Sequence, residues 1–494
     1  MKTLSELWSV DLRSLAAFRI ASGALILVDL GQRCTDMTAF YTDQGVFPRK
    51  ALLEAWWDPS RFSLLLASGD SWFTWLFAVV TMGAAVCWLA GYHTRRSAFL
   101  TWIFWVSWQW RVPMAMHGGD AIILLMLFWS IFLPAGARWS IDALLKVPEQ
   151  KVPDRIFSAA SIALLAQIVM MYECSAAFKS RWLGWVNGDA ISYAMNADFW
   201  TTAFGLRVFH HPAFFQPLAR FTLWFEWIGP VLLFVPWRTA VFRLGTIACF
   251  CAFHVGIILT LALGLFPVAD IVALLVFLPE EFWEALDRSP LVRRFFMENH
   301  FWKRWKNAWC EWIIKRGYPR RSLPLSLPCG VHLLAGSLWV LLVWFSLHTV
   351  VQKIPFPRWA HRAVTLMAFD HVWNLFSDQT TYDDRCVLAG RLRNGAWVDL
   401  LRDGRPFTWE RPAVPSESFP NSRWRIFMWS YTETAQPEIR PYLVEYYCRE
   451  WNEVHADAEH LESISVNRVR RIVFPRDDAR PPQIVSLLNQ SCAP

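Results

Sequence analysis

Three residues in apolar surroundings have side chains that can move protons: His117, Lys179 and His254. A histidine titrates near neutral pH, and burial makes a lysine amine easier to deprotonate, so both residue types can abstract a proton in a dry pocket. Two simpler explanations stay open. Lys179 can anchor a helix end by extending its amine toward lipid headgroups, and a membrane histidine is often a hydrogen-bonded packing residue. The chemistry indicated is acid–base catalysis.

Further ionisable side chains interrupt the same apolar segments. An ionised side chain costs about 2.5 to 3.5 kcal/mol at the centre of a membrane helix, so it normally faces a bundle interior or a watery cavity. We interpret Arg19, Asp120 and Glu226 as supporting charges around the candidate catalytic groups. Structural ion pairing is the alternative for Arg19 and Glu226. The other residues of this kind are Asp29, Glu173 and Asp270.

Apolar stretches of helical length must hold these residues. Because about 20 residues of helix span a bilayer, the shorter stretches need flanking residues or a tilted position in a bundle. The sequence predicts a mainly α-helical, polytopic transmembrane bundle of about 8 or 9 spans. The stretches are Leu15–Leu30, Trp75–Leu89, Ala98–Trp110, Ala121–Leu133, Ile156–Met171, Leu223–Val235, Leu244–Leu263, Phe266–Phe277 and Val331–Val350.

Composition agrees with a membrane protein. Of 494 residues, 55% are hydrophobic and 18% are charged, which is too apolar for ordinary soluble domains. The 32 Trp residues suit the lipid–water interface. A net charge of +7 without a basic arm argues against a nucleic-acid partner. Ten Cys without a Cys-x-x-Cys pair or a His/Cys ligand spacing argue against a metal site.

Basic loops set the expected orientation. Lys and Arg cluster between Glu280 and Pro328, and the positive-inside rule places this loop in the cytoplasm. No small-residue cleavage site follows the first apolar stretch, so we expect a retained helix and a cytoplasmic N-terminus. The ninth helix then exports everything after Lys353. His117, Lys179 and His254 all fall on the non-cytoplasmic side.

The chain is expected to have four parts. These are a transmembrane domain at 1–280, a basic cytoplasmic loop at 281–330, the last transmembrane helix at 331–352 and a non-cytoplasmic domain at 353–494. Within the loop, Trp302, Trp305, Trp309 and Trp312 have helical spacing among basic residues. This pattern predicts an amphipathic helix in the membrane interface, with a soluble connector as the alternative.

The C-terminal domain is predicted to be small and α+β. Asn394-Gly395 and Asp403-Gly404 separate short apolar runs and predict hairpins. Cys386 and Cys448 are a candidate disulfide in an oxidising compartment, which would leave Cys492 unpaired. Segments with helical character are Trp424–Ser430 and Tyr442–Asn452, and Ile464–Phe474 alternates like a strand.

Several segments in order resemble the horizontally transferred transmembrane (HTTM) family, which includes vitamin K-dependent gamma-carboxylases. The resemblance covers roughly residues 8 to 280. It rests on Tyr41–Arg49, His117–Asp120, Phe132–Asp142, Phe178–Lys179 with Trp185–Gly188, and Phe253–His254 with Gly264–Pro267. The C-terminal domain does not resemble that of the carboxylase, and Lys179-Ser180 stands where the carboxylase has two lysines.

The resemblance implies a carboxylase-like enzyme, a carbon–carbon lyase, that uses a quinol-type lipid such as vitamin K hydroquinone (menaquinol-like). By position Lys179 would deprotonate the quinol, His117 would orient it, and His254 would be a third pocket residue. The implied partners are the lipid bilayer, a quinol and a peptide substrate. Separately, the short C-terminal tail and the absence of a cleavable leader favour a bacterial inner membrane. The alternatives are a lipid or solute transporter and a non-catalytic membrane scaffold, although no internal repeat favours a transporter.

Overall fold

The computed structural model describes residues 1–197, 199–208, 212–290, 304, 308, 311, 315–316, 319–378, 382–434, 437–472 and 480–492. Its helices are α1 (Leu4–Leu7), α2 (Leu12–Thr35), α3 (Met37–Tyr41), α4 (Arg49–Ala55), α5 (Ser71–Ala90), α6 (Thr94–Arg111), α7 (Gly118–Ile131), α8 (Ile141–Leu144), α9 (Ala159–Lys179), α10 (Leu183–Asn187), α11 (Ala190–Asn196), α12 (Ala203–Val208), α13 (Pro212–Leu232), α14 (Thr239–Thr260), α15 (Phe266–Leu274), α16 (Glu280–Arg288), α19 (Cys329–Val351), α20 (Arg358–Leu366), α21 (Ser422–Thr434) and α22 (Arg440–Val454). Its strands are β1 (Val10–Asp11), β2 (Arg155–Ile156), β3 (Tyr382–Leu392), β4 (Trp397–Asp399), β5 (Arg405–Pro406), β6 (Leu461–Ile472) and β7 (Gln483–Ser491).

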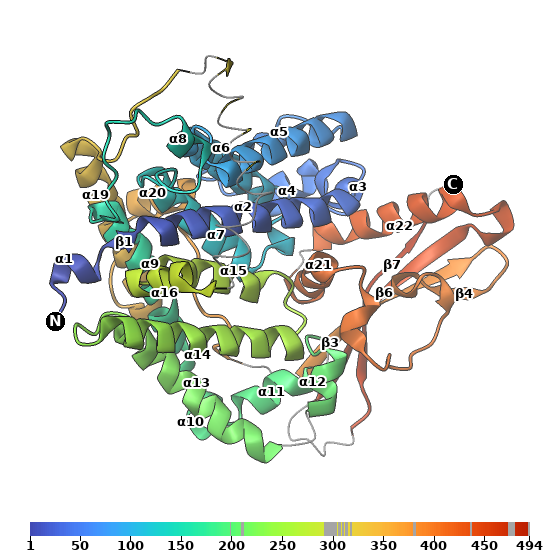
Figure 1. Cartoon of the computed structure of the whole chain (residues 1–494). Coiled ribbons are helices and arrows are strands. Elements are labelled where there is room, and N and C mark those ends of the chain that lie inside the picture. The colour runs from blue at the N-terminus through green and yellow to red at the C-terminus, as the bar shows by residue number, and fades with distance from the viewer. Residues whose placement is uncertain are drawn as a thin grey trace.

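The helices from α2 to α19 form one bundle. Helix α2 packs on α5, α5 on α6, and α6 on α7, while α9 contacts α7, α13 and α19. Helix α15 packs against α2, α7 and α14. The N-terminus lies at one end of this bundle, and the β3–β7 sheet of the C-terminal region lies at the other (Figure 1).

In the part of the chain that the structure describes, α2, α5, α9, α14 and α19 are long and apolar enough to cross a membrane. Helix α7 and residues 266–277 are shorter apolar helices. Seven of the nine predicted apolar stretches overlap the helices just named, and the other two overlap α6 and α13. The mainly helical class is confirmed, and these helices are compatible with an integral membrane protein. The number of crossings stays a prediction.

The short apolar helix α7 is a core helix. The 14 residues of α7 rise about 21 Å, which is less than the roughly 30 Å core of a bilayer. Nearly every residue of α7 is buried, because α6, α9 and α15 surround it. Because α7 is apolar on all sides and other helices surround it, its polar first turn lies in the protein interior.

An antiparallel sheet with strand order β5-β4-β3-β6-β7 forms the C-terminal region, and α21 and α22 pack against it. Both predicted hairpins are confirmed. Gly395 adopts φ +86° between β3 and β4, and Asp403 and Gly404 adopt φ +52° and +72° between β4 and β5. These turns require left-handed backbone conformations, which Gly and Asp adopt most easily. The predicted helices correspond to α21 and α22, and the predicted strand overlaps β6.

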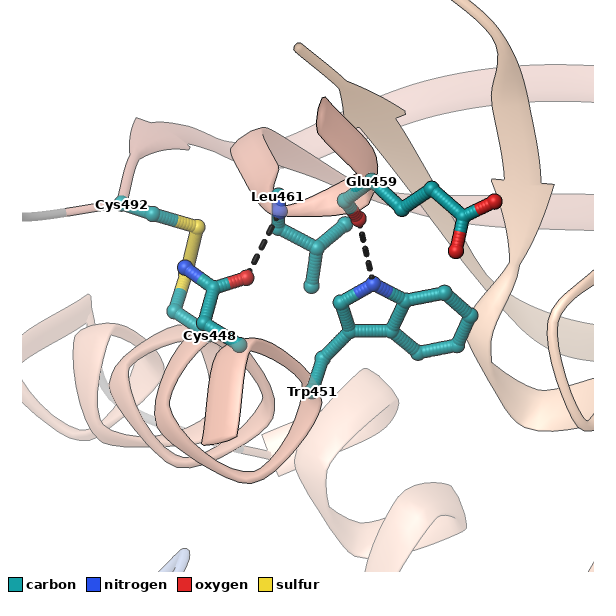
Figure 2. The surroundings of a disulfide bond; sticks show 6 residues. Cys448, Trp451, Glu459, Leu461 and Cys492 are labelled. Carbon is teal, nitrogen blue, oxygen red and sulfur yellow. Dashed lines mark hydrogen bonds between the residues drawn. A yellow bond between two sulfur atoms is a disulfide. The ribbon is translucent and has the colours of Figure 1, made fainter. Parts of the chain in front are cut away.

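The predicted disulfide is wrong. Cys448 on α22 bonds to Cys492 (Figure 2). Cys386 is a buried free thiol on β3. The sequence prediction missed β7, whose pairing with β6 continues to Cys492, which donates to the Glu462 carbonyl at 2.9 Å. This pairing brings the end of the chain beside α22. The predicted tryptophan-rich interfacial helix falls on residues outside the described ranges.

Candidate active site

Two aspartates and two arginines from distant parts of the chain meet inside the molecule. Asp29 and Arg33 lie one turn apart on α2, Asp120 lies in the first turn of α7, and Arg423 comes from α21. Arg33 donates to Asp29 at 2.6 Å and to Asp120 at 3.0 Å. Arg423 donates to Asp29 and, at 3.0 Å, to Asp120. We call these four residues the arginine–aspartate network.

The charges of this network cancel, and no member is more than 4% exposed. A buried ion pair is stable only when additional hydrogen bonds satisfy its remaining polar atoms. All four carboxylate oxygens accept hydrogen bonds. The Tyr41 hydroxyl accepts from Arg33 at 2.8 Å, and the Ala115 carbonyl accepts from Arg423 at 3.2 Å. The network therefore joins the C-terminal region to the bundle.

His117 caps α7 beside this network. Its Nδ1 accepts from the Asp120 backbone N–H at 3.3 Å, and the Asp120 carboxylate accepts from the His117 N–H at 3.1 Å. This reciprocal arrangement is a capping box, which fixes the imidazole at the start of the helix. A Cβ on Gly119 would lie 2.8 Å from the Phe266 Cα, so the contact of α7 with α15 requires glycine. Asp120 thus fixes the position of His117 at the start of α7.

Asp29, His117 and Asp120 place potential metal ligands within 4.8 Å of one another. The carboxylate oxygens already accept hydrogen bonds from the two guanidinium groups of the network. Nδ1 of His117 is also engaged, by the Asp120 N–H. Two fixed positive charges at the same oxygens oppose a bound cation, so we interpret these residues as an ion-pair network.

Lys179 and Glu226 form a second buried pair. Lys179 ends α9, Glu226 lies on α13, and Nζ donates to the two carboxylate oxygens at 2.5 and 2.7 Å. Nζ also donates to the Ser175 hydroxyl at 3.0 Å and lies 5.0 Å from the Trp185 ring centroid. Lys179 is 4% exposed and Glu226 is 3% exposed. The amine is therefore held inside the protein and does not extend to its surface.

His254 lies in the same charged region. Its Nε2 is 2.8 Å from the Tyr172 hydroxyl, and its Nδ1 is 3.7 Å from Oδ2 of Asp270 on α15. The second distance is too long for a hydrogen bond, and neither atom has another partner among the described residues. Asp270 interacts electrostatically with Lys179 and Glu226. We call Tyr172, Lys179, Glu226, His254 and Asp270 the lysine cluster.

A cavity of about 400 Å³ lies between the bundle and the C-terminal region. His117 and Phe266 line its bundle side, and Trp200 and Trp429 add further aromatic surface. The Phe266 ring centroid is 6.4 Å from that of His254, so Phe266 stands between the cavity and the lysine cluster. On its bundle side the cavity therefore borders both groups of buried charges, the arginine–aspartate network through His117 and the lysine cluster through Phe266.

One carboxyl group of the cavity wall is unusual. Burial and a hydrogen bond to Asp384 raise the pKa of Glu433, on α21, to about 7. Arg470 acts in the opposite direction from 3.7 Å. Glu433 is thus a group that changes charge near neutral pH at the C-terminal side of the cavity.

Arg19 lies apart from these residues. Its guanidinium donates to the carbonyls of Leu89 at 3.3 Å, Ala135 at 2.9 Å and Arg138 at 3.2 Å, and to that of Trp139. These carbonyls belong to the end of α5 and to the segment after α7, at the opposite end of α7 from His117. Arg19 therefore holds these two chain segments together through hydrogen bonds to backbone carbonyls.

The structure adds three residues that the sequence reasoning did not single out: Arg33, Arg423 and Tyr172. Arg33 had a usable signal, since it follows Asp29 by four positions on one helix. Arg423 had none, because it lies in a polar region far along the chain.

No known family, curated protein or solved structure matches this chain. The site must therefore be interpreted from its own geometry.

Proposed function

We propose that this protein is an integral membrane enzyme that transfers protons to and from a quinol-type lipid, as in the carboxylase family that it resembles. The lysine cluster behind the aromatic wall of the cavity is the observation that carries this proposal. Trp200, Phe266 and Trp429 offer flat apolar surfaces that suit an aromatic ring. Buried acid–base groups next to an apolar cavity are a general feature of catalytic sites.

The chain's own residues supply the proton chemistry. Transfer of a proton from Nζ of Lys179 to the Glu226 carboxylate would leave a neutral amine that can act as a base. His117, fixed by its capping box, would orient a ring in the cavity. A bound vitamin K hydroquinone would supply the reducing equivalents for a reaction with oxygen.

The proposed orientation places the N-terminus in the cytoplasm and the C-terminal domain outside, in the periplasm if the host is Gram-negative. The basic loops motivate it, and the N-terminus and the sheet lie at opposite ends of the bundle (Figure 1). The Cys448–Cys492 disulfide is of a kind that persists in an oxidising compartment. A peptide that reaches the cavity from that side is the proposed second substrate.

Quinol epoxidation by the purified protein tests the enzymatic proposal. Lys179→Met alone leaves the Glu226 charge buried without its partner, so a loss of activity could reflect misfolding. The double variant Lys179→Met/Glu226→Gln keeps the site neutral and of similar volume. We expect wild-type protein to be active and a folded double variant to be inactive. Equal epoxidation by both proteins would rule out Lys179 as the base.

A native-lipid mass spectrum of the purified protein addresses the cofactor directly. We expect a quinone to co-purify with wild-type protein, and a bulky substitution in the cavity wall, Gly118→Leu, to displace it. A Cβ added at Gly118 would lie 3.0 Å from side-chain atoms of Phe266 and Leu375, so a larger side chain there would take up space in the cavity. If no quinone is found and the chain is inactive, the transporter and scaffold alternatives apply. A scaffold would tolerate substitution of Lys179 and His117 but not deletion of the C-terminal domain.

A further inference from the structure

A second cavity of about 360 Å³ lies at the other end of α7 from the candidate active site. The turn between α5 and α6, the segment after α7 and residues 321–324 form its walls. It lies near the end of α5 at Ala90 and the start of α19 at Cys329, two of the helices that can cross a membrane. In a bilayer this position corresponds to the level of the lipid headgroups.

Positive charge dominates the lining of this cavity. Arg95, Arg96 and Arg321 face a single carboxylate, that of Asp142. The Asp142 carboxylate is itself occupied at the start of α6, where it accepts from the backbone of His93 at 3.0 Å and from Thr94 at 2.8 Å. The side chains that line the cavity therefore carry more positive than negative charge. The Asp142 carboxylate already accepts hydrogen bonds from the start of α6.

Arg321 is fixed beside a base. Its backbone N–H donates to the Leu145 carbonyl at 3.0 Å, and its Nη1 lies 2.9 Å from Nδ1 of His93. His93 adopts φ +46°, a left-handed conformation that is strained for a non-glycine residue. Burial, together with the nearby Arg321, lowers the pKa of His93. The chain thus holds a strained imidazole and a guanidinium together at the cavity wall.

The other two arginines leave donors for a ligand. Arg95 donates through Nη2 to the Pro324 carbonyl at 2.7 Å, and its buried Nε has no hydrogen-bond partner among the described residues. Arg96 is exposed at the rim. Guanidinium groups match the oxygens of a phosphate, to which they donate paired, charge-assisted hydrogen bonds.

We propose that this cavity binds a phosphate group, carried by the headgroup of an anionic phospholipid or by a soluble phosphate compound. The lining arginines donate to the phosphate oxygens, and the added negative charge offsets their mutual repulsion. This site is separate from the candidate active site, so the proposal stands whether or not the chain acts on a quinol.

Thermal unfolding of the delipidated full-length protein in a neutral detergent tests this proposal. The probes are phosphatidylglycerol, phosphatidylcholine with the same acyl chains, and inorganic phosphate, each titrated separately. The variants are Arg321→Gln and Arg96→Gln. Arg320→Gln is the matched control, because Arg320 is adjacent in sequence and exposed but does not line the cavity. Arg96 is also exposed, so its substitution leaves the fold intact.

We expect phosphatidylglycerol or inorganic phosphate to stabilise wild-type protein and Arg320→Gln more than phosphatidylcholine does. Both cavity variants should weaken this binding by about tenfold or more, as expected for loss of a charge-assisted contact. Preference for phosphatidylglycerol identifies a lipid ligand, and preference for inorganic phosphate identifies a soluble one. No preference for either anionic probe, or equal losses in Arg320→Gln and Arg321→Gln, would overturn the proposal.

Discussion

The arginine–aspartate network and the lysine cluster are both buried and charged, but they differ in how completely their polar atoms are satisfied. In the network every carboxylate oxygen accepts a hydrogen bond. In the lysine cluster His254 Nδ1 and Asp270 Oδ2 face each other at 3.7 Å without hydrogen-bond partners among the described residues. Arg423 Nε is without a partner among the described residues, but the hydrogen-bonded carboxylates of the network hold parts of the fold together. A buried imidazole and carboxyl group that face each other without hydrogen bonds indicate a site for chemistry. The network therefore has a structural role, and the cluster is the candidate for catalysis.

The largest expected effect comes from Arg423→Met. This change leaves Asp29 and Asp120 with Arg33 alone, so one buried negative charge has no partner. We expect a loss of about 3–5 kcal/mol in the free energy of unfolding. Denaturant unfolding followed by tryptophan fluorescence measures it. The double variant Arg423→Met/Asp29→Asn restores the charge balance and should recover much of the stability. Unchanged stability of the single variant would show that the network does not join the two regions.

The Lys179→Met variant should be the next most destabilised, by about 3 kcal/mol, because it strands the Glu226 carboxylate in the interior. Lys179→Met/Glu226→Gln should be close to wild type in unfolding experiments while lacking activity. Unfolding and activity measurements on the two variants together separate an effect on stability from an effect on catalysis. A double variant as unstable as the single one would mean that the pair has a mainly structural role, like the network.

A smaller effect is expected from pH at Glu433. Because its pKa is raised from 4.5 to about 7, the folded state keeps the proton that the unfolded state loses between these values. The stabilisation that protonated Glu433 contributes to the folded state is therefore fully present below pH 4.5, and it is lost as the pH rises through about 7. The group is partly solvated, so we expect about 1 kcal/mol. The difference in melting temperature between wild type and Glu433→Gln, measured from pH 4.5 to 8, should show this slope.

The smallest expected effect on stability is that of Asp270→Asn. Its Oδ2 has no hydrogen bond to lose in the described structure, so the unfolding free energy should change by less than about 1 kcal/mol. The same substitution should impair quinol turnover, because it removes the carboxyl group that faces His254 at 3.7 Å. A large destabilisation would place Asp270 with the network residues, and the distinction between the two regions would fail.

Much of the helical architecture could be predicted from the sequence, because apolar runs of helical length are a strong local signal. Turn residues likewise identified both hairpins, since Gly395 and Gly404 are needed where φ is positive. The short buried helix α7 was harder to interpret. Its apolar composition fits a membrane span as well as a helix surrounded by other helices.

The candidate site could be predicted only in part. Lys179 and Glu226 were visible as charges in apolar segments, but nothing in the sequence shows that they pair across α9 and α13. Arg423 carries no such signal, because an arginine in a polar segment is usually exposed. The Cys448–Cys492 bond was missed for a related reason, since it depends on the position of β7. Contacts between distant segments follow from tertiary packing, which local patterns do not encode.

The contribution of Arg423 to the bundle interior has a consequence for biosynthesis. Translation produces α2 and α7 long before α21, so the growing chain holds Asp29 and Asp120 with Arg33 as their nearest cation. The two like charges repel each other until the last quarter of the polypeptide has been made. Completion of the helical bundle thus awaits the arrival of a residue from the C-terminal region, and a chain that stops early would keep an unfinished interior that quality-control proteases can recognise.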